Sequence, residues 1–228
     1  MKNILYIAAT MLLFSSCFHV NTNWTSGKNA IKGEGPVITK SFDLKDFDQI
    51  VINGHADAVF TQSDTYEVTL RAQENVFDYV EYRVEGTTLI LEMKDKRTVR
   101  STEFDLTIKA PALKNLQVNG AADFDIPAGL VSDDDLKIEV NGAGDLTFKA
   151  VRCNNLSIQV NGAADVDLTD IDVQNLKVDV NGAGDVIVEG NAADASLSVN
   201  GAGDIDATNL KVSGKVSKHA AGIAKIKI

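Results

Sequence analysis

Apolar and polar residues alternate along much of the second half of the chain. Between Leu136 and Val140 the apolar positions are separated by Lys137 and Glu139, and the alternation resumes at Leu146 after a short Asn-Gly-Ala-Gly-Asp stretch. A period of two is typical of a β-strand with one buried and one solvated face. The pattern therefore predicts pairs of short strands, each pair joined by a tight turn.

These alternating segments are copies of one unit. The sequences LQVNGAADFDI, IEVNGAGDLTF, IQVNGAADVDL, VDVNGAGDVIV and LSVNGAGDIDA begin at residues 116, 138, 158, 178 and 197, and their asparagines are 22, 20, 20 and 19 residues apart. A fixed period near 20 indicates stacked units that bury their apolar faces against one another. The sequence predicts an all-β fold, a right-handed parallel β-helix or β-solenoid with coils of about 20 residues.

The turn motif is expected to form a ladder along the stack. Glycine adopts backbone angles that sharp corners require, and Asn and Asp side chains hydrogen-bond nearby backbone groups. Stacked asparagines can also bond to one another through their amides. The residues predicted to form this structural turn ladder are Asn53, Asn119, Asn141, Asn161, Asn181, Asn200, Asp57, Asp123, Asp145, Asp165, Asp185 and Asp204.

Calcium binding is the alternative for the same aspartates. Gly-Ala-Gly-Asp followed by an apolar residue is similar to the nonapeptide repeat of calcium-binding β-rolls. Here the period is about 20 with one turn motif per coil, and the glycine and aspartate are one residue closer together. We therefore favour the ladder and predict no metal and no cofactor.

Both ends of the repeat region diverge. Residues 50–60 form a sixth copy with Asn53 and Asp57 in matching places, and the 66 residues from Asn53 to Asn119 correspond to about three more periods. Strands are predicted within this interval at 66–70, 80–84, 88–93 and 104–109. We expect this half to seal one end of the solenoid or to form its broader first coils.

The tail is predicted to cap the other end. Residues 216–223 resemble a final copy with His219 at the Asn position. Four lysines lie in the last fourteen residues, and lysines at a sheet edge discourage strand-to-strand aggregation. A cationic tail that contacts a ligand is the alternative.

The N-terminus is typical of an export signal. Lys2 precedes an apolar run over residues 4–14, which is long enough for a signal peptide and too short to span a bilayer. Ser15-Ser16-Cys17 resembles a bacterial lipobox, although Phe14 stands where leucine is usual. We predict that Cys17 is lipidated; cleavage of an ordinary signal peptide after Ser16 is the alternative.

The chain is accordingly divided into five parts. These are a signal peptide (1–16), the lipidated cysteine with a flexible tether (17–36), an irregular β region of first coils or cap (37–111), the regular repeat solenoid (112–214) and a capping strand (215–228). Cys153 is then unpaired, and we expect it to pack as a small hydrophobic residue.

The charge balance excludes one class of partner. A formal net charge of −10 argues against nucleic-acid binding, which needs clustered Lys and Arg. Residues 112–214 hold 6 basic and 17 acidic side chains. We interpret these as solvated turn and strand positions; an acidic strip that recruits cations or a basic partner is the alternative.

These features together resemble a known family. The leader, Cys17, the Val-Ile-Asn-Gly segment at residues 51–54 and the tandem Val-Asn-Gly-Ala-Gly-Asp repeats are similar to the family described as "putative auto-transporter adhesin, head GIN domain", over residues 42–225. The resemblance implies a β-helical fold and a cell-envelope setting, and no functional residues transfer with it. The lipid anchor makes the membrane a partner and the outer membrane the expected location. Residues 18–26 contain no acidic residue, and the periplasmic or surface face stays open.

An enzyme is the main functional alternative, because β-helices also host polysaccharide lyases and hydrolases. Such sites need convergent carboxylates or a base flanked by Arg and Lys. The repeat carboxylates recur identically, and the basic residues among them are scattered. We therefore predict a non-catalytic cell-envelope lipoprotein, an adhesin-like binding or structural module whose ligand is a glycan or a protein.

Overall fold

The computed structural model describes residues 30–100 and 103–228. The predicted signal peptide, Cys17 and most of the predicted tether lie outside these residues. The fold is all-β, as the alternation predicts, with two short 3-10 helices between strands. Within the described ranges no helix is long and apolar enough to cross a membrane.

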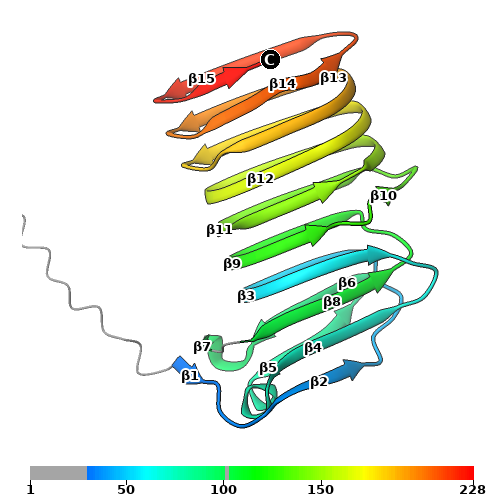
Figure 1. Cartoon of the computed structure of the whole chain (residues 1–228), viewed down its shortest axis with the longest axis vertical. Coiled ribbons are helices and arrows are strands. Elements are labelled where there is room, and N and C mark those ends of the chain that lie inside the picture. The colour runs from blue at the N-terminus through cyan, green and yellow to red at the C-terminus, as the bar shows by residue number, and fades with distance from the viewer. Residues whose placement is uncertain (1–29, 101–102) are drawn as a thin grey trace, which may run out of the picture.

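The repeat units form a stack of parallel strands in which homologous residues face one another (Figure 1). Asn141 lies opposite Asn161, and Asp145 lies opposite Asp165. The strands of this stack are β9 (Asn115–Ile126), β10 (Leu130–Val131), β11 (Leu136–Lys149), β12 (Val151–Gly182), β13 (Val186–Gly201), β14 (Asp204–Val212), β15 (Val216–Gly222) and β16 (Lys225–Lys227).

In β9, β11 and β12 the Asn-Gly motif lies within a continuous strand, which corrects the expected turn between two strands for these copies. At the two later copies β12 ends at Gly182 and β13 ends at Gly201, and the next strands begin at Val186 and Asp204. Strands β11 and β12 pair residue by residue through the motif. Gly182 has a φ of 155°, and a Cβ built there would lie 1.9 Å from the carbonyl oxygen of Gly162. The motif therefore bends a chain that stays hydrogen-bonded to the neighbouring unit, as the Ala183 N–H does to the Gly162 carbonyl at 2.8 Å. The close approach of the two backbones leaves no room for a side chain.

Each unit also contributes a third buried run. Residues 150–155 connect one motif-bearing segment to the next, and they do not form an outer loop. They continue the ladder, with Leu130 opposite Val151, and the side chains of Val151 and Cys153 are buried. Ala150, with a φ of 50°, forms the corner before them. The core of the stack is thus enclosed on three sides, and Phe124 and Phe148 meet inside it edge to face at 6.2 Å.

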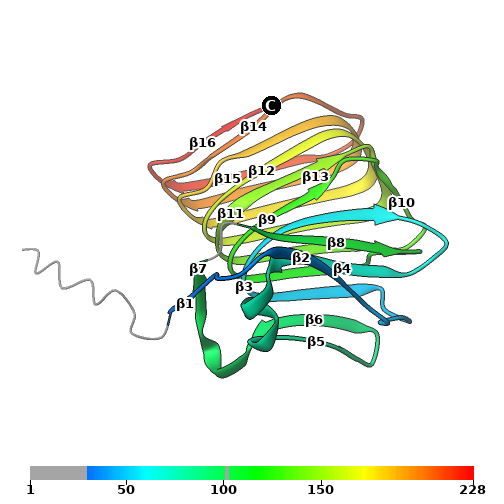
Figure 2. The ribbon, with the colours of Figure 1, turned by 60° about the horizontal axis from the view of Figure 1, so that its bottom comes forward.

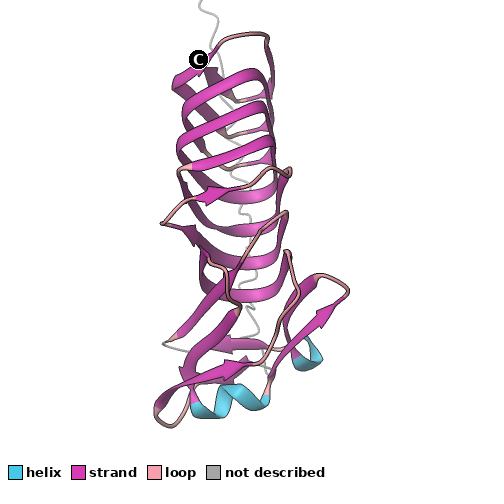
Figure 3. Cartoon of the chain, turned by 90° about the vertical axis from the view of Figure 1, so that its right-hand side faces the viewer, coloured by secondary structure: helices cyan, strands magenta, loops and turns pink. Residues whose placement is uncertain are grey.

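A cap of shorter strands closes the N-terminal end of the stack (Figures 2 and 3). Its antiparallel pairs are β2 with β4, β4 with β8, and β5 with β6. The elements are β1 (Ala30–Lys32), β2 (Val37–Phe42), β3 (Gln49–Gln62), β4 (Glu67–Gln73), η1 (Glu74–Asp78), β5 (Val80–Glu85), β6 (Thr88–Met93), η2 (Lys94–Lys96), β7 (Thr98–Arg100) and β8 (Phe104–Ala110).

The cap corrects the spacing argument. Strand β3 pairs directly with β9, and Asn53 lies opposite Asn119. No further units stand between them, because the intervening chain reverses direction through turns such as the one at Gly86 instead of winding on in parallel. The four strands expected in the interval correspond to β4, β5, β6 and β8.

The last unit is shifted relative to the sequence prediction. Ala221, and not His219, lies opposite Asn200, while His219 lies opposite Ser198. The connection between β14 and β15 lengthens the unit to 21 residues, so the count of 19 selects the wrong position. Gly222, which lies opposite Gly201, carries the true register.

Candidate functional site

The asparagines of the motif form one hydrogen-bonded column along the stack. In each step the side-chain amide nitrogen donates to the side-chain oxygen of the asparagine one unit nearer the cap. The donor-acceptor distances are 2.8 Å for Asn119 to Asn53, 3.0 Å for Asn141 to Asn119, 2.9 Å for Asn161 to Asn141, 3.1 Å for Asn181 to Asn161 and 3.2 Å for Asn200 to Asn181. All five bonds point the same way.

A carboxylate at the cap end accounts for this common direction. Asn53 Nδ2 donates to Glu92 Oε2 at 3.5 Å, and an ionised carboxylate can only accept. Asn53 must therefore present its amide nitrogen to the cap and its oxygen to Asn119. Each later asparagine inherits this orientation from the one before it. Arg83, which donates to Oε1 of Glu92 at 2.5 Å, holds the carboxylate in place.

Residues two positions before the asparagines support the column from the side. Gln117 donates to Asn119 at 3.0 Å, and Glu139 accepts from Asn141 at 3.0 Å. The bond from Asn141, followed by that from Lys137, lowers the pKa of Glu139. Sequence reasoning missed these partners and Glu92. Gln117 and Glu139 could have been found from the sequence, because a polar residue stands two positions before each of these asparagines.

The aspartates form a second column on the exposed side of the corner. Asp123 Oδ1 accepts the backbone N–H of Asp145 at 2.9 Å. The same bond recurs from Asp185 to Asp165 at 3.0 Å and from Asp204 to Asp185 at 2.9 Å. One carboxylate oxygen in each pair therefore replaces a backbone acceptor between units.

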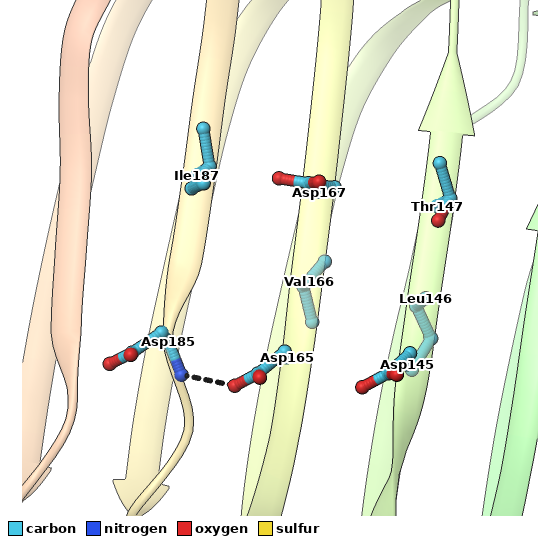
Figure 4. A pocket seen from close by; sticks show the side chains of 8 residues that line it. All are labelled: Asp145, Leu146, Thr147, Asp165, Val166, Asp167, Asp185 and Ile187. Atoms are coloured by element: carbon cyan, nitrogen blue, oxygen red, sulfur yellow. Dashed lines mark hydrogen bonds between the residues drawn. The ribbon is translucent and has the colours of Figure 1, made fainter.

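The aspartate column borders an acidic cleft of 420 Å³ (Figure 4). Asp145, Asp165 and Asp185 lie in a row with their carboxylates pointing the same way, and Asp167 stands in the next row. None of the eight residues that line the cleft is basic. Over the described part of the chain, no group of three or more His, Cys, Asp or Glu side chains has a geometry that could hold a metal ion.

The family model described as "putative auto-transporter adhesin, head GIN domain" matches residues 46–228. The chain belongs to this family. The stack, both columns and most of the cap therefore lie within the head GIN domain. No curated protein matches the sequence.

Solved structures share the fold of this head GIN domain protein. A putative adhesin from Bacteroides fragilis is 22% identical, with a TM-score of 0.71 over 86% of this chain and 99% of that one. A putative lipid binding protein from Parabacteroides distasonis is 22% identical, with a TM-score of 0.75 over 87% of this chain and all of the other. A putative adhesin from the same species is 24% identical, with a TM-score of 0.75 over 86% of this chain and 84% of that one.

The remaining candidate residues do not assemble into reactive chemistry. Cys17 lies outside the described residues. Cys153 is 8% exposed, and burial raises the pKa of its thiol to about 11, so it carries almost no thiolate at neutral pH. His55 belongs to the cap end and His219 to the last unit, at opposite ends of the stack.

Proposed function

We propose that this head GIN domain protein is a non-catalytic, adhesin-like binding or structural module of the cell envelope, held at the outer membrane by a lipidated Cys17. We further propose that the stack is a right-handed parallel β-helix. The in-register parallel pairing of 20-residue units supports the β-helix, and family membership supports the envelope setting.

The recurrence of identical exposed side chains is the observation that carries the binding role. Successive units present the same carboxylate at the same corner, one strand spacing apart, which is about 4.8 Å. A catalytic centre needs groups that differ in role, such as an acid and a base. A repeated row instead suits an extended glycan or polypeptide, which can make the same weak contact several times over.

A polysaccharide-processing enzyme is less consistent with this geometry. A lyase needs a base with an adjacent Arg or Lys to stabilise the developing negative charge. The lining of the acidic cleft contains no Arg and no Lys. An inverting or retaining hydrolase needs one carboxyl group with a raised pKa beside an ionised one. Three of the four carboxylates of the cleft, those of Asp145, Asp165 and Asp185, are stacked copies in successive units. The fourth, Asp167, lies opposite Thr147 and Ile187.

A glycan array and a pull-down from envelope extracts, both with the soluble domain of residues 27–228, test the binding role. We expect saturable binding that weakens when Thr147 and Asp167 are replaced by arginine on the exposed face. Replacement of exposed Lys149 by glutamine serves as the control. Release of shortened or unsaturated sugar products from any bound polysaccharide would contradict the non-catalytic proposal.

A further inference from the structure

Gly54 is the motif glycine nearest the cap, and the structure has an opening on its cap side. Strand β3 pairs with β6 up to Asn53 and with β8 from Asp57 onward. Among the described residues, none pairs in parallel with residues 54–56 on the cap side, because β6 ends at Met93 and the chain turns away through η2 into β7.

This opening is a cleft of a different kind from those along the stack. A Cβ at Gly120 would lie 2.2 Å from the carbonyl oxygen of Gly54, whereas a Cβ at Gly54 would meet Met93 Cγ at 3.8 Å. At Gly54, the flexible Met93 side chain thus occupies the place that the backbone of the preceding unit occupies at the later corner glycines. The space enclosed is 460 Å³, which lies within the range of about 300–1,000 Å³ found for small-molecule sites.

The walls of the cleft are largely apolar and carry one formal charge. Met93, Val99, Ala121 and the two corner glycines supply the apolar surface, and Arg97 is the charged residue of the lining. The Arg97 guanidinium lies over the ring of Tyr79, 5.3 Å from its centroid. Its Nε is 3.9 Å from Asp95 Oδ2, which is too long for a hydrogen bond. Arg97 is therefore positioned by the Tyr79 ring, and its ion pair with Asp95 is long and not bidentate.

His55 is the other polar group of the cleft, and it stands where the regular copies carry alanine. Its Nδ1 lies 2.9 Å from the carbonyl oxygen of Ala121. A carbonyl only accepts, so Nδ1 carries a proton and donates, which fixes the orientation of the ring. The cleft thus combines an apolar body with a guanidinium and an oriented imidazole.

We propose that this first-corner cleft, formed by Gly54, His55, Met93, Arg97, Val99 and Ala121, binds a small flat organic anion. The ligand class is an aromatic or short aliphatic carboxylate or sulfonate, with its apolar body against Met93 and Val99 and its anionic group beside Arg97. This site is separate from the exposed columns to which we assign the adhesin-like role, so neither proposal depends on the other.

Met93 supplies a site-specific reporter, because the other methionines are Met1 and Met11 in the predicted leader. The full chain in lipid nanodiscs, with carbon-13 in its methionine methyl groups, is titrated with naphthalene-2-sulfonate. We expect a saturable shift of the Met93 methyl signal, which is assigned by its loss in Met93→Leu. A shift that grows linearly without saturation would overturn the site.

A matched pair of alanine variants locates the ligand. Ala121→Leu fills the cleft and should abolish the saturable shift. Ala163→Leu, the same exposed motif position two units away, should leave it intact. Equal affinity in all three proteins would overturn the site.

Arg97→Gln should weaken the affinity for the sulfonate at least about threefold, whereas Arg100→Gln, three residues further on at the end of β7, should not. Neutral 2-naphthol should bind wild type and Arg97→Gln alike. Equal effects of the two arginine changes, or no effect of either, would overturn the proposed preference for anions.

Discussion

Asn119 Nδ2 lies 2.8 Å from Asn53 Oδ1, although 66 residues separate the two side chains. This bond joins the cap to the first regular unit, and it continues the bond pattern of units that are only 19 to 22 residues apart. The same asparagine-to-asparagine hydrogen bond therefore forms whether the chain between the two residues is one unit or the whole cap. The asparagine column thus marks the continuity of the stack more faithfully than the spacing of the motif does.

The corner glycines should be intolerant of any side chain. Gly182→Val forces a Cβ to within 1.9 Å of the Gly162 carbonyl oxygen at a φ of 155°. We expect a loss of more than about 2 kcal/mol in the free energy of unfolding, measured by denaturant titration. Ala183→Val, at the exposed neighbouring position, should cost less than about 0.5 kcal/mol. Equal unfolding midpoints for the two variants would contradict this account of the corner.

The middle of the asparagine column should matter more than its end. Asn161→Ala removes one bond to Asn141 and one from Asn181, and it leaves their polar atoms without partners. We expect a loss of about 1–3 kcal/mol in unfolding free energy. Asn200→Ala removes one bond at an exposed position and should cost about 0.5–1 kcal/mol. A larger effect at Asn200 would be inconsistent with a cooperative column.

The aspartate column should tolerate loss of charge and not loss of the acceptor. Asp165 Oδ1 accepts the Asp185 backbone N–H at 3.0 Å, and an asparagine oxygen can accept the same bond. Asp165→Asn should therefore change the unfolding free energy by no more than about 0.5 kcal/mol, while Asp165→Ala should cost about 1 kcal/mol. If Asp165→Asn and Asp165→Ala proved equally destabilising, the negative charge, and not the acceptor oxygen, would be the stabilising feature.

Calcium should not be required for folding. The turn carboxylates accept backbone N–H groups, and buried apolar side chains fill the stack as far as Leu210 in β14. The soluble domain of residues 27–228 should keep its β-type circular dichroism spectrum in excess EGTA, and millimolar calcium should raise its Tm by only a few degrees, about what weak binding produces. Loss of the spectrum on chelation, restored by calcium and not by matched ionic strength, would instead make the aspartates metal ligands.

The proposed anchor depends on one side chain. Metabolic labelling with an alkyne fatty acid should mark the wild-type protein and not Cys17→Ser. Cys153→Ser should label like the wild type, since the Cys153 thiol is buried. Equal labelling of wild type and Cys17→Ser would remove the lipid anchor from the proposal.

The sequence predicted the regular units well because their asparagines are in phase and their apolar residues alternate. It could not place the cap, since the motif disappears between Asn53 and Asn119 and a spacing alone does not say whether the chain winds on or folds back. The register of the last unit failed for a related reason, because a length of 19 was assumed where the structure has 21. The column's direction depends on Glu92, whose position follows only from the pairing of β6 with β3.

The pairing of β3 with β9 also has a consequence for the order in which the protein folds. Neighbouring regular units need to close loops of about 20 residues, whereas Asn53 and Asn119 close one of 66. The difference in closure entropy is about 1 kcal/mol, from the logarithm of the length ratio. Because each regular unit contacts mainly its neighbours, assembly can begin anywhere among them and spread. We therefore expect the pairing of β3 with β9 to form after the regular units have assembled. During refolding, the amide protons between β3 and β9 should become protected later than those between β11 and β12.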